Sequence, residues 1–527
     1  MSNICGAPAV QRGRKTGWHA VALALAGMAL LAVTGCWPGS NYQKPQMTAP
    51  DAYKEAVPSG DWKVSNPQDA MLRGKWWEIF NESELNQLEE QLNINNQNIA
   101  QSFENFVMAR DQVAQARASY WPTVTVGMSG SRMRQPPMGT TIVGVHQSAT
   151  TINSFQLPLS VSWQPDLFGK IRSQVSQSTA AAQVSAADLE NVRLSAQASL
   201  AEFYFELRGQ DALIDLYRKT LENYQQTLDL TRARQETGLG SDEDVAGAEA
   251  NLKAAQAQAT ALAATRAQYE HAIALLIGKP AGQFSLPERA LTAEAPTVPS
   301  GLPSQLLERR PDIAAAERTV AQYNAVLGIG KASYFPSLSI QTGGGTQSTT
   351  FSNVFNAGNL YWSFGPSISE TIFDGGQRKA VYNQYKAQYA ASSATYRETV
   401  LNAFKEVEDY LSSVRLLSTE IRQQDDAILS AQRYYELATT RYETGLDTYL
   451  NVLTAQTTLL NNRQTGITMR INRITASVQL IQALGGGWDA SQLPTYQQLK
   501  DGYKTGDATL AQGAVLPTQP TSSPAKN

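Results

Sequence analysis

The sequence predicts a mixed α/β membrane protein in which one unit, a β-hairpin joined to a hairpin of long helices, occurs twice. Three observations lead to this class. The turn segment RQETGL at residues 234–239 returns as RYETGL at 441–446, 207 residues later. Apolar residues spaced three and four apart stand before and after both turns, and segments of alternating apolar and polar residues precede both long helices. Self-similarity at a fixed spacing indicates internal repeats.

The helical pattern is a heptad pattern on both sides of each turn. The seams cover residues 200–228, 245–276, 407–435 and 452–483. A period of 3.5 keeps one stripe facing a partner helix in a left-handed coiled coil. Glycine after a last turn that contains arginine is a helix stop, so each hairpin should close at Thr-Gly-Leu. We expect long helices at 168–237 and 375–444 and shorter ones at 241–279 and 448–485.

Alternating residues predict β-hairpins at 121–166 and 335–373, each with one apolar and one polar face. One helix, from about residue 81 to 120, should precede the first hairpin and stop before Pro122. Four strands cannot close a barrel, and an open sheet edge cannot lie in a bilayer, so we expect strands to be shared between chains. We interpret the glycine run 343–345 as a point of backbone flexibility.

The N-terminus has the pattern of an export signal over residues 1–35, with Arg12, Arg14 and Lys15 before an apolar run. The segment Val-Thr-Gly before Cys36 resembles a bacterial lipobox, and this resemblance implies that Cys36 is lipidated. The alternative is an ordinary cysteine beside a conventional cleavage site. An extended segment at 36–80 should then lead to a first repeat at 81–279, a linker at 280–302, a second repeat at 303–485, and an irregular C-terminal segment with a polar tail at 486–527.

Composition and motifs exclude several classes of function. The chain has 43 basic and 46 acidic residues, and loss of the signal leaves a more acidic body, which argues against a nucleic-acid partner. One cysteine would remain, so no intramolecular disulfide is expected. The sequence contains no catalytic set, spaced Cys/His metal cluster or phosphate-binding glycine motif, so we expect no enzyme activity and no cofactor. Around Pro311 we expect a helix start, with Asp312 near its positive end, rather than a binding site.

An ordered set of motifs resembles a known family. The motifs are WWEIF at 76–80, DLFGK at 166–170, LLERRPDIA at 306–314, ASYFP at 332–336 and the two Thr-Gly-Leu turns. Over residues 36–488 the chain resembles an outer membrane factor of the TolC/NodT-like kind, the lipoprotein exit ducts of multidrug efflux pumps. The resemblance implies a homotrimer with a twelve-stranded β-barrel in the outer membrane, continuous with a periplasmic α-helical coiled-coil barrel. It also implies a periplasmic adaptor (membrane fusion) protein and an RND-type inner-membrane pump as partners.

The resemblance also implies roles for residues at the turns. Tyr442 and Asp244 match a tyrosine and an aspartate whose bond holds the closed state, although both could be ordinary solvated residues. Asn451 and Thr454 stand where some relatives have aspartates, which leaves Asp447, Asp242 or Glu243 to form any acidic ring. The candidate adaptor contacts are Arg234, Thr237, Gly238, Leu239, Arg441, Thr444, Gly445 and Leu446.

These observations predict a passive exit duct for small toxic compounds or drugs, opened at its periplasmic tip by adaptor and pump. A protein of this kind would be lipid-anchored in the cell outer membrane and would span it. Two alternatives remain open at this level. One is the exit duct of a type I protein secretion system, and the other is a coiled-coil scaffold lipoprotein without a pore.

Overall fold

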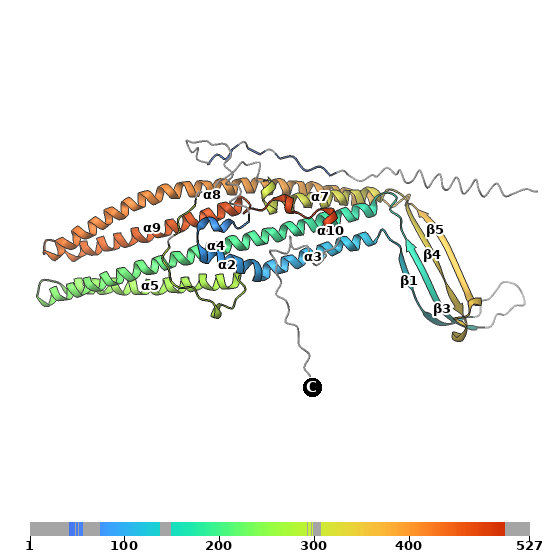
Figure 1. Ribbon diagram of the computed structural model, residues 1–527, viewed down its shortest axis with the longest axis horizontal. Helices are drawn as coiled ribbons and strands as arrows, with labels where there is room; N and C mark the ends of the chain where they lie inside the picture. Colours follow the sequence, from blue (N-terminus) through green and yellow to red (C-terminus); the bar gives the residue numbers. More distant parts are fainter. Residues whose placement is uncertain are drawn as a thin grey trace, which may run out of the picture. The chain divides into compact units, whose positions relative to one another are not determined.

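The computed structural model describes residues 42–47, 49–50, 52–55, 74–136, 149–291, 293–296, 298 and 307–500 (Figure 1). Its described parts form two units. The strand unit lies within Gln112–Thr179 and Ala321–Ala390, and the helical unit lies within Lys44–Asp111, Ala180–Val320 and Ala391–Asn527. The predicted signal peptide, the lipidation site Cys36 and the tail beyond residue 500 lie outside the described residues.

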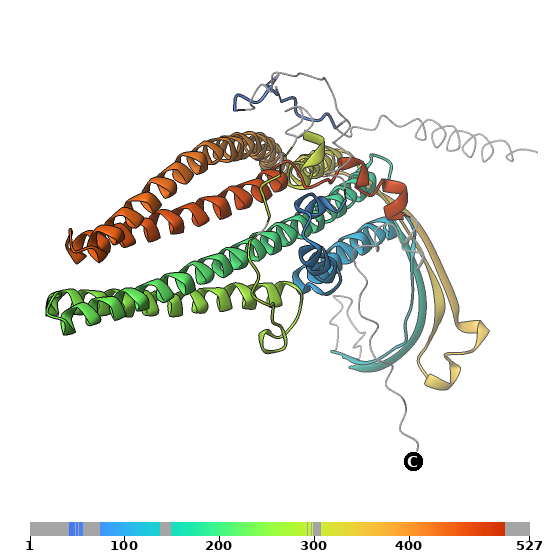
Figure 2. The same cartoon turned by 60° about the vertical axis from the view of Figure 1, so that its left-hand side comes forward.

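Two helical hairpins dominate the helical unit, and Figures 1 and 2 show the helices of each hairpin side by side. Helices α4 (Lys170–Glu236) and α5 (Asp242–Leu276) form the first, and α8 (Gln377–Glu443) and α9 (Tyr449–Ala483) form the second. Both long helices have 67 residues, which corresponds to about 100 Å of helix. Every predicted seam position is buried or half-buried, which confirms the heptad assignment.

The helix predicted from residue 81 to 120 is wrong in one respect, because it is divided at Asn96. Helix α2 covers Ser83–Asn95 and α3 covers Gln97–Ala118. The Oδ1 atom of Asn96 accepts hydrogen bonds from the amides of Asn98 (3.0 Å) and Ile99 (3.1 Å), so this side chain caps α3. Its Nδ2 atom donates to the carbonyl of Leu276 at the end of α5 (2.8 Å). The break therefore satisfies two helix ends with one buried amide.

The WWEIF motif forms a short 3₁₀ helix, η2 (Trp76–Phe80), and lies in the core of the helical unit. Trp76 is fully buried and donates its indole N–H to Gln197 Oε1 on α4 (3.3 Å). The Phe80 ring contacts Phe205 of α4 with 4.9 Å between centroids. This motif thus packs the chain before α2 against the first long helix.

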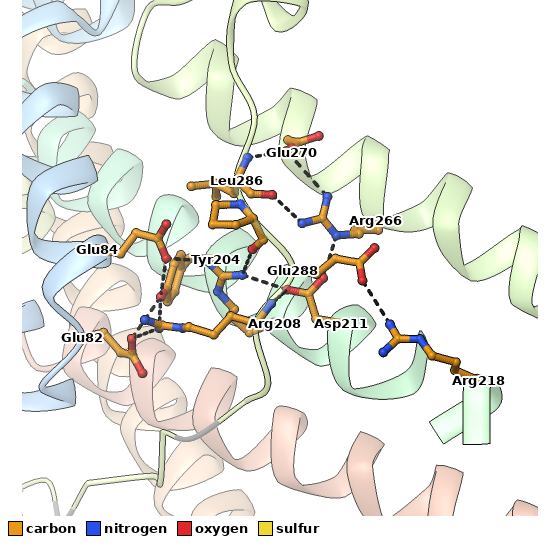
Figure 3. A network of polar contacts seen from close by, with 12 residues as sticks. Glu82, Glu84, Tyr204, Arg208, Asp211, Arg218, Arg266, Glu270, Leu286 and Glu288 are labelled. Atoms are coloured by element: carbon orange, nitrogen blue, oxygen red, sulfur yellow. Dashed lines mark hydrogen bonds and ion pairs between the residues drawn. The ribbon is translucent and has the colours of Figure 1, made fainter. Parts of the chain in front are cut away.

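The linker is held in place by buried charges (Figure 3). Arg208 on α4 is 1 % exposed and donates Nη1 to Asp211 (2.8 Å) and to the linker carbonyl of Pro287 (2.7 Å), while Nη2 binds Glu84 of α2. Asp211 also accepts from Arg266 Nε on α5 (2.6 Å). A buried ion network stabilises only when its members are satisfied, so loss of one partner leaves an uncompensated charge.

The linker backbone itself takes part in this network. The carbonyl of Leu286 accepts from Arg266 (2.7 Å), and its amide donates to Glu270 of α5 (2.6 Å). The amide of Arg289 donates to Asp211 (3.1 Å), and its side chain binds Glu82 and the Tyr204 hydroxyl. The described linker residues near 286–289 are therefore bound to Glu82, which precedes α2, and to α4 and α5. Their composition did not indicate this role.

Helix α7 (Pro311–Ala332) begins at Pro311, which confirms the structural interpretation of the RRPD segment. The Arg310 side chain donates Nη1 to Glu406 (2.7 Å) and to the carbonyl of Ala483 at the end of α9 (3.0 Å), and Nη2 to Asp312 (2.6 Å). This arginine therefore joins the start of α7 to α8 and α9.

The expectation of irregular chain from residue 485 onward is wrong as far as residue 500. A 3₁₀ helix, η6 (Ala490–Gln492), and a short helix, α10 (Tyr496–Lys500), follow the glycine run. Trp488 is buried against Ala187 and Ala314. Trp488 therefore anchors this short polar segment, and the segment has regular structure although its glycine content suggested irregular chain.

Residues near the N-terminus of the described chain are bound to α8. The amides of Lys54 and Glu55 donate to the two carboxylate oxygens of Glu408 (2.8 and 3.0 Å), and Arg415 binds the Glu55 side chain. Tyr53 beside them is buried. This part of the predicted extended segment is thus fixed by side chains of the second hairpin.

In the strand unit the described strands form one antiparallel sheet, which Figure 2 shows as strongly curved. The strands are β1 (Thr123–Val126), β2 (Ser129–Gln135), β3 (Thr150–Trp163), β4 (Ser337–Ser348) and β5 (Leu360–Ser369). Both β1 and β2 pair with β3 in one continuous register, and the order continues through β4 to β5. The interruption between β1 and β2 lies opposite Pro158, which has no amide N–H to complete the ladder.

The interpretation of Gly343–Gly345 as flexible is wrong, because these residues lie inside β4 and pair with both β3 and β5. Gly345 is the register partner of Pro158, and a Cβ atom there would lie 2.3 Å from the carbonyl oxygen of Leu157. The glycine is needed for close approach of two backbones.

Among the described residues, no helix combines the length and the apolar character that a membrane-spanning helix requires.

Candidate functional site at the helical turns

Each Thr-Gly-Leu turn is a helix end closed by its own backbone. Gly238 and Gly445 have φ values of +74° and +78°, in the left-handed region that glycine adopts without steric cost. The next residue turns back in both cases, because the amide of Leu239 donates to Arg234 O and that of Leu446 to Arg441 O, both at 2.8 Å. This is a Schellman-type end, and it explains why glycine stands at the same place in both copies.

The threonine and leucine of each turn have different tasks. Thr237 donates its hydroxyl to the carbonyl of Arg234 (3.0 Å), and Thr444 donates to that of Arg441 (3.1 Å), which satisfies a carbonyl at each helix end. The leucines have no such internal role, since Leu239 is 72 % exposed and Leu446 is 71 % exposed. Each turn thus presents one apolar side chain on a rigid backbone.

The helices that follow the turns begin differently. Ser241 caps α5 in a capping box with Asp244, which accepts from the Ser241 amide (3.3 Å). At α9, the Asp447 carboxylate accepts instead from the amide of Thr448 (2.9 Å) and from Asn451 Nδ2 (2.6 Å). The Asn451 amide, the Thr448 amide and the Arg441 side chain hold the pKa of Asp447 below its ordinary value.

Arg234 connects the two turns within one chain. Its Nη1 atom donates to the carbonyl oxygens of Tyr442 (3.1 Å) and Glu443 (3.3 Å), the last residues of α8. Its guanidinium carbon lies 4.7 Å from the centroid of the Tyr442 ring. A cation at a helix C-terminus and over an aromatic face is favourable on both counts. The equivalent Arg441 stays in its own turn and pairs with Asp447 (3.2 Å).

Tyr442 is only 4 % exposed, and its ring contacts that of Tyr449 with 5.7 Å between centroids. Its hydroxyl has no hydrogen-bond partner among the described residues. The implied bond between Tyr442 and Asp244 is therefore not formed within one chain. Burial raises the pKa of the Tyr449 phenol, and the negative charge of Asp244 raises it further.

The structure brings together some of the implied gate residues and separates others. Asp447 and Asn451 are joined by a hydrogen bond, as described above. Thr454 instead donates its hydroxyl to the carbonyl of Leu450 in its own helix (2.8 Å). Asp242 accepts from Gln235 and lies at the first turn. Sequence reasoning named Arg234 as an adaptor contact but missed its bridge to α8. The available signal was that Gly240 stands at the position equivalent to Asp447, so Arg234 lacks the acid with which Arg441 pairs.

Comparison with known proteins agrees with this arrangement. The outer membrane efflux protein family matches residues 88–279 and 302–486. TtgC of Pseudomonas putida, a probable efflux pump outer membrane protein, is 31 % identical over 457 residues, covering 86 % of this chain and 93 % of its own length. SrpC of Pseudomonas putida, a solvent efflux pump outer membrane protein, is 31 % identical over 476 residues, covering 88 % and 98 %. The open-state crystal structure of the Neisseria gonorrhoeae MtrE outer membrane channel superposes with a TM-score of 0.73 at 25 % identity, covering 86 % and 99 %.

The fold and these matches define the class as outer membrane channels of efflux systems. The chain belongs to the outer membrane efflux protein family. Its function is that of an exit duct, and it lies in the cell outer membrane with a long periplasmic extension.

Proposed function

We propose that the chain works as a homotrimer whose three sheets close one twelve-stranded transmembrane β-barrel, with β1 and β2 counted as one interrupted strand, and whose helices close a periplasmic barrel. The observation that carries this is the described sheet, which ends in β1 and β2 on one edge and in β5 on the other. Unpaired strand edges cannot remain in lipid, and pairing β5 of one copy with β1 and β2 of the next removes them. The equal offsets of α4 and α8, and of α5 and α9, support two repeats per chain.

In this proposal the trimer is the passive outer part of a tripartite efflux system, with lipid attached at Cys36. A periplasmic adaptor contacts the turns and an inner-membrane pump supplies the compounds. The exposed Leu239 and Leu446 support the adaptor contact, because each is an apolar side chain on a preorganised turn. The activities of relatives point to small organic compounds, since these relatives include a solvent and a toluene efflux pump protein. The same names favour efflux over protein secretion.

The gate of this duct lies at the turns in our proposal, and the Arg234 bridge is one of its constraints. It joins the first turn to the end of α8, while Tyr442 offers an unused hydroxyl beside it. This hydroxyl is buried within the single chain, so a bond between it and Asp244 requires the turns to rearrange in the assembled trimer. Acids from three copies, Asp447 first among them, would favour cations at the constriction.

The test is the resting conductance of purified trimers in planar bilayers. Arg234→Ala should raise it, because two helix-end carbonyls and the Tyr442 ring lose their cation. Arg441→Ala is the matched control and should change it less, since that arginine pairs only within its own exposed turn. Tyr442→Phe and Asp244→Ala should each raise conductance if the bond between these residues forms in the closed trimer. Equal, unchanged conductance in all four variants would mean that the turns do not hold the gate.

A further inference from the structure

The register of the sheet defines one apolar face in the strand unit. On β3 this face is formed by Phe155, Leu157, Leu159, Val161 and Trp163. Val124 and Val126 of β1 are the register partners of Val161 and Leu159 and share that face. The opposite face is polar, as the 2.7 Å contact between the hydroxyls of Thr125 and Ser160 shows. The apolar face is the one that suits lipid.

Two arginines continue this same face beyond its apolar part. The pairs run from Gly130 and Phe155 to Arg132 and Asn153, and then to Arg134 and Thr151. Alternate residues of a strand share a face, so Arg132 and Arg134 project on the side of Phe155. Both side chains are exposed, and neither forms an ion pair with any residue that the structure describes. Two unpaired cations thus stand where the apolar face ends.

The position of these arginines agrees with the thickness of a membrane. From Trp163 to Asn153, the register partner of Arg132, β3 advances roughly 33 Å at about 3.3 Å per residue, which is about 25 Å along the membrane normal for a strand tilted by about 40°. The apolar band of outer membrane barrels is about 25 Å tall. Arg132 therefore lies at the edge of the band, at headgroup level, where a charged side chain avoids the cost of the bilayer centre.

Aromatic rings mark the same level. The ring of Phe351, from the segment between β4 and β5, lies 5.7 Å from that of Phe155 and 6.5 Å from that of Phe355. Phe351 and Phe355 are 53 % and 69 % exposed. Exposed aromatic side chains gather at membrane interfaces, so this edge of the face has the composition of an interfacial belt.

We propose that Arg132 and Arg134 bind the phosphate groups of a lipid headgroup in the outer leaflet. Guanidinium groups match phosphate oxygens in a bidentate geometry, and two of them on alternate residues lie about 7 Å apart. Helix α3 precedes β1 and helix α4 follows β3, so both helices adjoin the strand ends that lie away from Arg132 and Arg134. With these helices in the periplasm, the end of the sheet that carries the two arginines faces the outer leaflet. The assignment rests on the proposed barrel, in which the apolar face contacts lipid.

The test uses the purified protein in an uncharged detergent, titrated with lipid A that carries two phosphates. Arg132→Gln/Arg134→Gln should bind it about 30-fold more weakly, from the typical effect of two cations near a lipid surface. Lys253→Gln/Lys405→Gln removes the same charge from exposed positions on α5 and α8 and should bind like the wild-type protein. Raising the salt concentration should reduce the difference between the two variants.

Three results would overturn the site. In the first, the arginine variant and the wild-type protein bind lipid A with equal affinity. In the second, the lysine control loses as much affinity for lipid A as the arginine variant does. In the third, inorganic phosphate binds as tightly as the lipid. Dephosphorylated lipid A should bind all three proteins alike. Single-channel conductance separates this inference from the proposed function. A conducting arginine variant with unchanged lipid affinity contradicts only the site, whereas a non-conducting wild-type protein contradicts the barrel.

Discussion

Glu89 is an acid without a partner in the core of the helical unit. It is fully buried on α2, and neither carboxylate oxygen has a hydrogen-bond partner among the described residues. Burial raises the pKa of this carboxyl well above its ordinary value. The native state therefore keeps a proton that the unfolded chain releases above about pH 4.3. The free energy of unfolding should therefore fall by about 1.4 kcal/mol per pH unit as the pH rises from about 4.3 toward the pKa of Glu89 in the native state.

Replacing this group should therefore stabilise the protein in a pH-dependent way. Glu89→Gln should raise the unfolding temperature more at pH 8 than at pH 5, as measured by circular dichroism at one scan rate. Glu90→Gln is the matched control, because Glu90 is exposed and pairs with Lys75 at 2.5 Å. Equal increments at both pH values for Glu89→Gln would show that its ionisation does not limit stability.

At the scale of single elements, β4 depends on glycine for its place between β3 and β5. Gly345→Val would put a side chain 2.3 Å from the carbonyl of Leu157 and should prevent pairing at Pro158. Gly365→Val on β5 is the control, because a Cβ atom there has its nearest neighbour at 4.0 Å. We expect the first variant to lose assembled trimers in outer membrane extracts and the second to keep them. Normal trimer yield from Gly345→Val would refute the close approach.

The backbone of the first turn leads to a second prediction about a single structural element. Gly238→Val leaves room for the side chain, since nothing lies within 4 Å, but the left-handed backbone should cost the turn about 1–2 kcal/mol. Efflux should be lost while trimers persist, because only the presented turn changes. Gly282→Val, also in open space but without a positive φ, should leave drug resistance intact. Full resistance in a strain that carries Gly238→Val would argue against adaptor docking at this turn.

The sequence predicted elements better than it predicted contacts. Heptad spacing and glycine stops predicted the long helices correctly, because both signals are local in the sequence and packing in a coiled coil requires them. The break at Asn96 was missed, since its cause is a hydrogen bond to Leu276, far along the chain. Gly345 was misread for the same reason, because its partner Pro158 belongs to the other hairpin. The spacing of apolar residues and the composition of a segment carry no information about contacts between residues that are far apart in the sequence.

At the scale of the whole molecule, the same limit applies to charges. Arg208 gathers Glu84, Asp211 and the carbonyl of Pro287 from three segments, and no motif links them. Arg234 was noticed at the first turn, yet its bridge to Tyr442 depends on how the second hairpin lies beside the first. The family resemblance supplied the class of protein and the expectation of a trimer. It could not supply the pairs that are particular to this chain.

In our proposal three copies of the chain form one membrane pore. The most direct measurement combines the mass of the purified, detergent-solubilised assembly with its single-channel conductance in a planar bilayer. We expect a heat-resistant trimer that produces discrete conductance steps, and we expect its conductance to rise when Arg234 is replaced by alanine. A stable assembly that never conducts, with or without that substitution, would contradict it and would favour a coiled-coil scaffold.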